Sequence, residues 1–210
     1  MNRNTIAIIA NGEMLHASLM QKIIKQSDII IVTDGGIKSC RAADIQPHYI
    51  IGDMDSSTGL EREFFSSARI IHDPDQETTD MQKALHFAAS LKPQRIKVMA
   101  ALGKRADHST ANLLILQEFN STCPVEIYDN FGRLTLLRPG NHALNVVKGS
   151  TVSFFSLGPI SGLSLSGFQF NLAEKNYPSY FIGISNVVAE NGCQVTFETG
   201  GLFMYEAFIQ

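Results

Sequence analysis

The chain has 210 residues, of which 44% are hydrophobic and 18% are charged, and its formal net charge is −3. These values are typical of a globular protein that buries a proper core, and they argue against a disordered chain. Because no run of Lys and Arg occurs, they also argue against a protein that binds a nucleic-acid backbone.

The first two thirds of the chain alternate between apolar runs and segments with helical spacing. The predicted strands cover 5–10, 28–33, 48–51, 69–72, 96–101 and 125–129, and the predicted helices cover 14–26, 37–43, 60–65, 79–91 and 107–118. Near-continuous apolar strands that alternate with helices predict a mostly parallel, Rossmann-like sheet with helices on both faces. We therefore expect an α/β fold over this part.

The pattern changes after Pro139-Gly140. Turn residues recur roughly every eight to twelve positions, and short apolar or alternating runs lie at 151–155, 195–198 and 202–205, as in an all-β unit. The segment 133–137 is an ambiguous strand at the border. We expect two domains, a nucleotide-binding catalytic α/β domain over 1–138 and a small β-sandwich over 139–210.

Three cysteines, Cys40, Cys123 and Cys193, stand far apart and form no Cys-x-x-Cys pair. This spacing argues against a zinc site or a disulfide framework, and it favours buried thiols in a reducing compartment. The apolar run 5–10 is too short for a signal peptide, and no apolar stretch approaches the length of a membrane span. We therefore expect a cytoplasmic protein.

Four polar clusters follow predicted strands, at 33–36, 52–57, 73–80 and 102–108. In a parallel sheet these strand ends lie on one edge, where ligands bind in open α/β sheets. The acidic residues of the clusters are Asp34, Asp53, Asp55, Asp75, Asp80 and Asp107. Each of them alone is explained as well by a turn or a helix cap, and Thr79 with Gln82 forms the pattern of a capping box.

Carboxylates crowded at one edge repel each other unless a cation lies among them. Oxygen ligands favour a hard cation such as Mg²⁺ or Mn²⁺, and Mg²⁺ usually binds a few carboxylates together with substrate phosphates. We expect Asp53 and Asp55 to form the main metal clamp, with Asp80 as a third ligand. The clusters thus predict a site for a metal-bound nucleotide.

Basic residues enter the same edge from the loop after the fifth strand. Arg105 can contact phosphate oxygens through its guanidinium fork, and we expect it to do so. For Lys104 and His108 the residues alone leave a phosphate contact and an ordinary surface or capping role equally open.

Motifs of several other enzyme classes are missing from the sequence. It contains no Gly-x-x-x-x-Gly-Lys-[Ser/Thr] loop, no Gly-x-Gly-x-x-Gly after the first strand and no Gly-x-Ser-x-Gly elbow. P-loop, dinucleotide-dependent and α/β-hydrolase chemistry are therefore unsupported.

The ordered set of motifs resembles the thiamine pyrophosphokinase family over nearly the whole chain. The matching motifs are Asn11-Gly12-Glu13, Asp34-Gly35-Gly36, Gly52-Asp53-Met54-Asp55-Ser56, Asp75-Gln76-Glu77-Thr78-Thr79-Asp80, Gly103-Lys104-Arg105-Ala106-Asp107-His108, Gly167-Phe168-Gln169-Phe170-Asn171-Leu172 and Gly183-Ile184-Ser185-Asn186. Two positions depart from the family pattern. Lys104 stands where the family often has a second Gly, and the chain has no Trp, whereas some members have one in the 167–172 segment.

The resemblance implies a transferase, a thiamine diphosphokinase, that moves the β,γ-pyrophosphate of ATP to the hydroxyl of thiamine and releases AMP. It implies Mg²⁺ on Asp53, Asp55 and Asp80. It implies a homodimer in which the β-domain of one subunit helps to form the thiamine pocket. The implied catalytic residues are Asp34, Asp53, Asp55, Asp80, Arg105 and Asp107. The implied ATP-binding residues are Asn11, Gly12, Gly35, Gly36, Asp75, Gln76, Thr78, Thr79, Lys104, Arg105 and His108. The implied thiamine-binding residues are Phe170, Ser185 and Asn186.

Three alternatives stay open. The chain could pyrophosphorylate another small alcohol such as a hydroxymethylpterin, which keeps the reaction and changes the acceptor. Asp53-x-Asp55 could serve a glycosyltransferase as a clamp for a sugar nucleotide, which Asp80 and the 105–108 motif disfavour. The chain could also be a non-catalytic module that binds nucleotide or thiamine, which the full acidic set disfavours.

Overall fold

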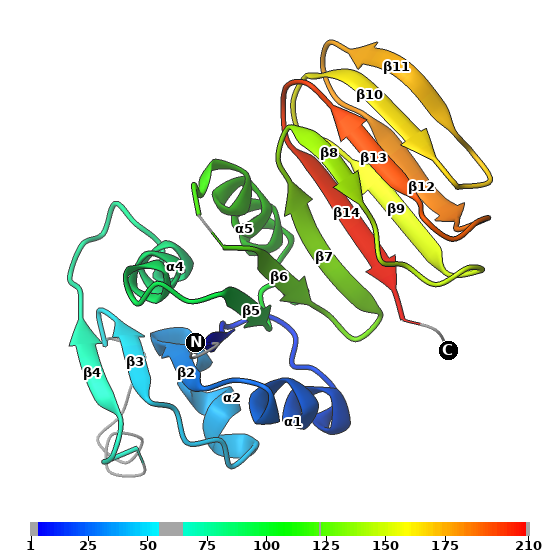
Figure 1. The fold of residues 1–210 in the computed structure, drawn as a ribbon. Coiled ribbons are helices and arrows are strands. Elements are labelled where there is room, and N and C mark those ends of the chain that lie inside the picture. Colours follow the sequence, from blue (N-terminus) through cyan, green and yellow to red (C-terminus); the bar gives the residue numbers. More distant parts are fainter. Residues whose placement is uncertain (1–3, 55–64, 122, 209–210) are drawn as a thin grey trace. The chain divides into compact units, whose positions relative to one another are not determined.

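The computed structural model describes residues 4–54, 65–121 and 123–208 of the chain. It divides into two compact units, Met1–Asn130 and Phe131–Gln210. Strand pairing is parallel in the first unit and antiparallel in the second, which makes this a mixed α/β chain (Figure 1). Within the described ranges, no helix is both long enough and apolar enough to cross a membrane.

The first unit is built on parallel strands. They are β1 (Thr5–Ile9), β2 (Ile29–Thr33), β3 (Tyr49–Gly52), β4 (Arg69–His72), β5 (Arg95–Met99) and β6 (Val125–Tyr128). Their order across the sheet is β6-β5-β1-β2-β3-β4. Every pair formed by these neighbours is parallel, so their carboxyl ends share one edge.

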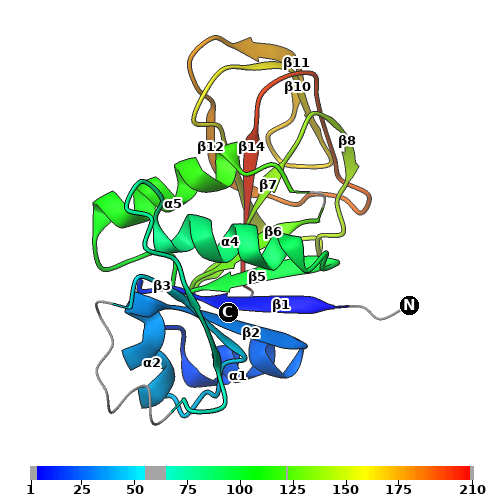
Figure 2. The ribbon, with the colours of Figure 1, turned by 90° about the vertical axis from the view of Figure 1, so that its left-hand side faces the viewer.

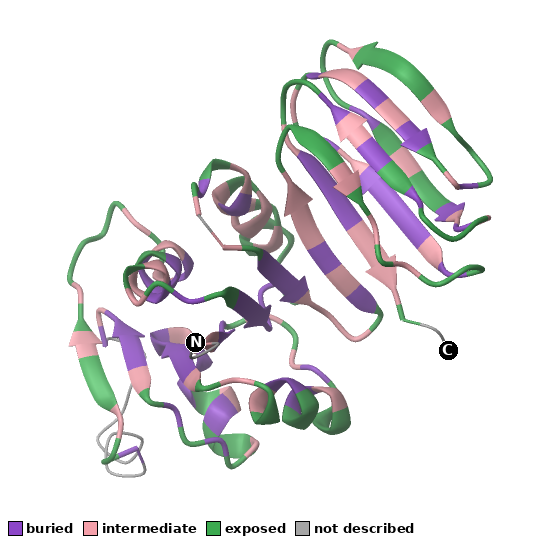
Figure 3. Ribbon diagram, in the orientation of Figure 1, coloured by how far each residue is buried: buried purple, intermediate pink, exposed green. Residues whose placement is uncertain are grey.

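Helices cover both faces of these strands. The helices are α1 (Ala17–Lys25), the short 3₁₀ turn η1 (Asp34–Gly36), α2 (Ile37–Ala42), α4 (Asp80–Ser90) and α5 (Ala106–Glu118). Figure 2 shows α1 and α2 on one face and α4 and α5 on the other. Successive strand residues point to opposite faces, so strands covered on both sides are apolar throughout. Figure 3 shows β1, β2 and β3 as mostly buried, as expected from their apolar runs.

The core under α1 and α2 illustrates this layering. Ala7, Ile9 and Val32 from the strands pack with Met20 of α1 and Cys40 of α2. On the other face, α4 packs onto β3, where the rings of Phe87 and Tyr49 meet edge to face with centroids 4.9 Å apart.

The second unit consists of two antiparallel sheets. Its strands are β7 (Gly132–Leu137), β8 (Gly140–Ala143), β9 (Thr151–Phe155), β10 (Ile160–Ser166), β11 (Leu172–Tyr177), β12 (Ile182–Val187), β13 (Gln194–Phe197) and β14 (Leu202–Ala207). The strand orders are β12-β9-β14-β7 and β11-β10-β13-β8. One hydrophobic core joins residues of both sheets, such as Phe154 and Leu202 from the first and Leu163 and Phe197 from the second.

Most predicted elements of the first unit are confirmed within one or two residues, and strand 69–72 is identical to β4. The predicted start of the first helix at residue 14 is wrong, because α1 begins at Ala17. Asn130 holds the preceding segment: it donates to the carbonyl of Met14 at 3.2 Å and accepts from the backbone N–H of His16 at 2.6 Å. The helix predicted near 60–65 falls almost entirely outside the described residues.

The two compact units meet at Asn130/Phe131 rather than at the predicted 138/139. The ambiguous segment 133–137 forms most of β7, which pairs along its whole length with β14. It therefore groups with the antiparallel strands. The strand predicted at 151–155 is identical to β9, whereas β8, β10, β11 and β12 were not predicted individually.

Candidate functional site

Gly52, at the end of β3, lies close to two acidic residues, Asp34 directly after β2 and Asp80 at the start of α4. A Cβ added to Gly52 would lie 2.6 Å from the Cβ of Asp34 and 3.1 Å from Oδ1 of Asp80. Gly52 has φ +152°, and Asp53 follows it directly. The close approach excludes any larger residue at position 52. Asp34 and Asp80 therefore lie close to the backbone of Gly52, directly before Asp53 in the chain.

Asp53 is held by the loop between β4 and α4. Nε2 of Gln76 donates to Oδ2 of Asp53 at 3.0 Å. This hydrogen bond orients one carboxylate oxygen and joins the loops after β3 and β4. Asp55, the other half of the predicted clamp, lies outside the described residues.

Asp75 organises the turn that carries Gln76. Its two carboxylate oxygens accept from the hydroxyl of Thr78 at 2.6 Å and from the backbone N–H of Glu77 at 2.9 Å. The Thr78 hydrogen bond, followed by the Glu77 one, lowers the pKa of Asp75 below its usual value. Both Asp75 and Thr78 were predicted to bind ATP, and their side chains here bind each other.

Thr79 caps α4, which places Asp80 as the first residue of that helix. Oγ1 of Thr79 accepts from the backbone N–H of Gln82 at 3.2 Å, and Oε1 of Gln82 accepts from the backbone N–H of Thr79 at 2.9 Å. The predicted capping box is thus confirmed. A helix N-terminus also favours nearby negative charge, so the cap supports a carboxylate or phosphate at this point.

The loops after β1, β2 and β5 touch each other. Nζ of Lys104 donates to the carbonyl of Asn11 at 3.2 Å, and a Cβ added to Gly35 would lie 2.6 Å from Nδ2 of Asn11. The backbone N–H of Gly12 donates to the carbonyl of Ala100. A Cβ at Gly36 would meet the β1 carbonyl of Ile9 at 2.8 Å. The glycines of the Asn11-Gly12-Glu13 and Asp34-Gly35-Gly36 motifs thus allow the backbones of neighbouring loops and strands to pack closely at this edge.

Arg105 and Asp107 form an exposed ion pair at the start of α5. Nη2 and Nε of Arg105 donate to the two carboxylate oxygens of Asp107 at 2.5 and 3.1 Å, and the backbone N–H of His108 donates to Oδ1 at 2.9 Å. The alternative that Asp107 caps the helix is wrong, because Arg105 occupies the N-cap position and Asp107 lies in the first turn.

The guanidinium of Arg105, with the His108 N–H as a second cause, lowers the pKa of Asp107 to about 2. A carboxylate with so low a pKa is fully ionised near neutral pH and is a poor proton acceptor. Asp107 therefore suits holding Arg105 in place better than deprotonating an alcohol.

Several residues of the site adopt backbone conformations that L-residues rarely adopt. Met54, Ala100 and Lys104 have φ values of +65°, +54° and +55°, and all three follow β3 or β5. Such strain often gathers at functional sites. The value at Lys104 also explains why a glycine suits this position, where the family often has one.

In the second unit, Asn186 and Phe170 are brought together. Oδ1 of Asn186 accepts from the backbone N–H of Phe170 at 3.1 Å, and Nδ2 donates to the carbonyl of Phe170 at 2.7 Å. Asn186 is only 5% exposed, whereas Phe170 is 71% exposed. The buried amide thus fixes the backbone that holds an aromatic side chain out in solvent.

Ser185 lies beside Asn186 in an irregular part of β12. The register with β9 shifts between Gly183 and Asn186, and Ser185 has φ +57°. Its backbone N–H donates to the hydroxyl of Ser153 at 2.9 Å. The resemblance implied that this segment binds thiamine, and in the structure it forms a strand with a register shift.

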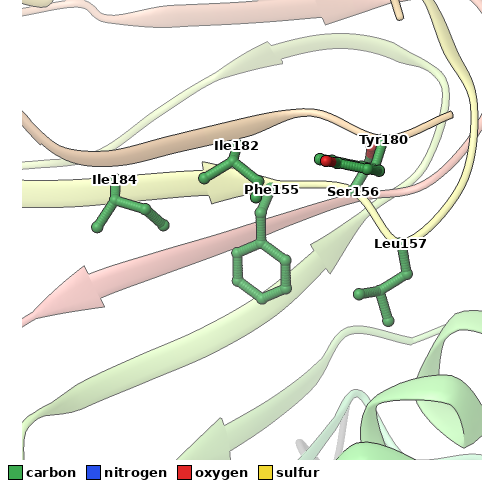
Figure 4. Close-up of a pocket in the computed structure, with 6 residues that line it drawn as sticks. All are labelled: Phe155, Ser156, Leu157, Tyr180, Ile182 and Ile184. Carbon is green, nitrogen blue, oxygen red and sulfur yellow. The ribbon is translucent and has the colours of Figure 1, made fainter. Parts of the chain in front are cut away.

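An apolar pocket of about 380 Å³ lies elsewhere in the second unit. It is lined by Phe155, Ser156, Leu157, Tyr180, Ile182 and Ile184 (Figure 4). Sequence reasoning missed this pocket because β12 was not predicted as a strand.

Lys83 is the residue of the first unit that sequence reasoning missed. It lies in α4, is 7% exposed, and donates through Nζ to the carbonyls of Asp73 and Asp75. Its spacing was a signal, since a residue three positions after Asp80 lies on the same side of the helix.

Comparisons with known proteins agree with this geometry. The model of the thiamin pyrophosphokinase catalytic domain matches residues 20–127, and that of the thiamin pyrophosphokinase vitamin B1 binding domain matches residues 141–202. The chain belongs to the thiamine pyrophosphokinase family.

Thiamine pyrophosphokinases from plants and bacteria are similar in sequence. Thiamine pyrophosphokinase 1 of Oryza sativa subsp. japonica is 29% identical over 166 residues, which are 72% of this chain and 62% of the rice protein. Thiamine pyrophosphokinase of Bacillus subtilis is 26% identical over 176 residues, which are 80% of this chain and 81% of the bacterial protein. The chain thus spans less than two thirds of the rice relative.

The fold is that of solved thiamine pyrophosphokinases. The crystal structure of the B. subtilis protein superimposes with a TM-score of 0.80 at 23% identity, covering 99% of this chain and 100% of that one. Yeast thiamin pyrophosphokinase superimposes with a TM-score of 0.82 at 14% identity, covering 99% of this chain and 87% of the yeast chain.

Proposed function

We propose that the chain transfers the β,γ-pyrophosphoryl group of ATP to the hydroxyl of thiamine, giving thiamine diphosphate and AMP. The observation that carries the proposal is the close approach of Asp34 and Asp80 to Gly52, the residue directly before Asp53, in a chain of this family. We interpret the first unit as a Rossmann-like catalytic domain and the second as a β-sandwich that binds thiamine.

The acidic residues fit a bound Mg²⁺. Among the residues that the structure describes, no three His, Cys, Asp or Glu side chains are grouped to hold a metal by themselves. Mg²⁺, however, usually takes one or two carboxylates and completes its shell with phosphates and water. Asp53 and Asp80 offer such carboxylates, and Asp55 would add another. When bound, Mg²⁺ would offset the negative charge of the polyphosphate.

ATP would lie along the shared edge of the parallel strands. We expect Arg105 and Lys104 to contact phosphate oxygens, since both are basic and lie in the loop that enters this edge. Asn11, Gly12, Gly35, Gly36, Gln76 and His108 would line the nucleotide site, with Asp75, Thr78 and Thr79 shaping the loop beside it.

Positioning would supply most of the rate enhancement. A loose transition state for phosphoryl transfer needs no strong base, so alignment of the alcohol in line with phosphorus is the main requirement. Asp34 is buried and close to Gly52, which suits a residue that orients groups in the site. Phe170, held by Asn186, and Ser185 would contact thiamine.

We also propose a homodimer whose second unit contributes to the thiamine pocket of the partner subunit. The support is the exposed apolar surface of β12, which within the described part of the chain is an edge strand paired with β9 alone. Ile182 and Ile184 are both 62% exposed there and line the pocket of Figure 4. The three cysteines are free thiols, which suits our proposal of a cytoplasmic location.

Product analysis tests the proposed reaction. The protein is mixed with ATP, Mg²⁺ and thiamine, and nucleotides and thiamine species are separated. We expect AMP and thiamine diphosphate in equal amounts. ADP with thiamine monophosphate would contradict pyrophosphoryl transfer. AMP formation with a hydroxymethylpterin but not with thiamine would favour the other acceptor, and binding without turnover would favour a non-catalytic module.

A further inference from the structure

Lys83 is a buried cation beneath the loop that joins β4 to α4. Its Nζ donates to the carbonyl oxygen of Asp73 at 2.8 Å and to that of Asp75 at 2.5 Å. These two residues flank Pro74, so one ammonium group ties together both sides of the bend. Lys83 itself sits in the second turn of α4, a helix whose start is fixed by the Thr79 capping box.

An ammonium group is costly to bury unless hydrogen bonds and nearby negative charge compensate it. Backbone carbonyls provide the hydrogen bonds here. The carboxylate of Asp75 provides negative charge nearby, since the positive charge of Lys83 is one of the smaller causes that lower the pKa of Asp75. A neutral side chain would not offset carboxylates in the same way, so the charge itself has a use at this position.

The loop that Lys83 ties down reaches the acidic site through Gln76, and the helix that carries Lys83 reaches it through Asp80. Gln76, which directly follows Asp75, donates to Oδ2 of Asp53. Asp80, three residues before Lys83 in α4, places Oδ1 beside Gly52. A displacement of the loop would therefore alter the orientation of Asp53, while Asp80 would keep its helical anchor.

We infer that Lys83 is a positioning residue for the metal-bound nucleotide: it fixes the 73–76 bend so that Gln76 holds Asp53 in the orientation that binds Mg²⁺ and ATP. This inference rests on the proposed ATP site. It assigns Lys83 no contact with either substrate, and it predicts that the residue acts on ATP binding and leaves thiamine binding unchanged.

The test measures binding of the Mg²⁺ complex of α,β-methylene ATP by calorimetry, without thiamine and without turnover. Lys83→Met keeps the length of the side chain and removes the ammonium group. We expect it to weaken binding about 10–100-fold, the range typical when the outer partner of a metal ligand is removed. Lys83→Arg retains charge and donors and should keep most of the affinity. Lys25→Met, which changes an exposed lysine of α1, is the matched control and should bind as the wild type does.

Turnover provides the second readout. Lys83→Met should raise the KM for ATP by a similar factor while the KM for thiamine stays within about twofold of wild type. Unchanged analogue binding by Lys83→Met, or an equal rise in both KM values, would overturn the inference. If Lys83→Met does not fold, Lys83→Gln replaces it in both measurements, with the same expected losses. Absence of turnover in the wild type with intact analogue binding would contradict the proposed function and leave the binding test of Lys83 in force.

Discussion

Asn186 fixes the backbone of an exposed aromatic residue without itself reaching the surface. Both polar atoms of its amide bind the backbone of Phe170, and Oδ1 also accepts from the backbone N–H of Val187 at 2.9 Å. The motif that contains Asn186 was expected to bind thiamine directly. The hydrogen bonds instead favour an indirect role, in which a buried amide presents an exposed aromatic ring to a flat cationic ligand.

We predict that Asn186→Ala raises the KM for thiamine roughly 10-fold, because the loss of hydrogen bonds to a buried amide costs on the order of 1–3 kcal/mol and loosens Phe170. The KM for ATP should change little, since that site belongs to the other unit. Steady-state kinetics with each substrate varied in turn measure the effect. Asn176→Ala is the control, because Asn176 also accepts from a backbone N–H, that of Gly162, at a different place in the same unit. Equal rises in the KM for thiamine and the KM for ATP would indicate a general loss of folded structure instead of a local effect on Phe170.

At the scale of the elements, the strand ends bring the site together, and α4 supplies one of its carboxylates. The capping box fixes where α4 begins, and hence where Asp80 stands. Thr79 was expected to bind ATP, but its hydroxyl is engaged with the backbone of Gln82. We therefore expect Thr79 to contribute mainly to the stability of α4.

We predict that Thr79→Ala lowers the free energy of unfolding by about 1 kcal/mol, the usual cost of losing an N-cap hydroxyl. Urea denaturation followed by circular dichroism measures the change. Thr79→Ser, which keeps the hydroxyl, should stay close to wild type. A Thr79→Ala variant of full stability would show that the cap contributes nothing measurable.

The elements also show what the sequence could predict. Strands of the first unit are buried on both faces, so their apolar runs gave clear signals, and parallel topology then implied that their acidic ends converge. The start of α1 depends on Asn130, which is 114 residues from His16, and no local pattern contains that contact. β11 is mostly exposed, and β12 alternates only over 182–185 before the polar Asn186, so neither sequence gives a clear strand signal. Lys83 escaped notice because a lysine in a helix is usually a solvated surface residue.

At the scale of the whole molecule, two units carry two tasks in our account. The family models divide the chain in the same sense, with a catalytic domain and a vitamin B1 binding domain. The apolar surface of β12 adds a reason for association, because exposed edge strands with apolar side chains tend to pair with another chain.

We predict that Ile184→Asp converts the proposed homodimer into a monomer, because a charge in a buried apolar contact is costly to desolvate. Light scattering after size-exclusion chromatography gives the mass directly. Val147→Asp is the matched control, since Val147 is also an exposed aliphatic residue of the second unit but lies outside the pocket. An Ile184→Asp variant that remains dimeric, or a monomeric wild type, would contradict the proposed interface.

In our account, Asp53 after β3 and Asp80 at the start of α4 serve one metal-bound ATP site. The most direct measurement compares AMP formation by Asp53→Asn, Asp80→Asn and the double variant. If both residues serve the same bound metal, each single change should lower kcat/KM by orders of magnitude, and the double variant should be about as slow as the slower single one. A double variant whose kcat/KM falls by the product of the two single losses would contradict a shared site. So would a single variant with wild-type activity.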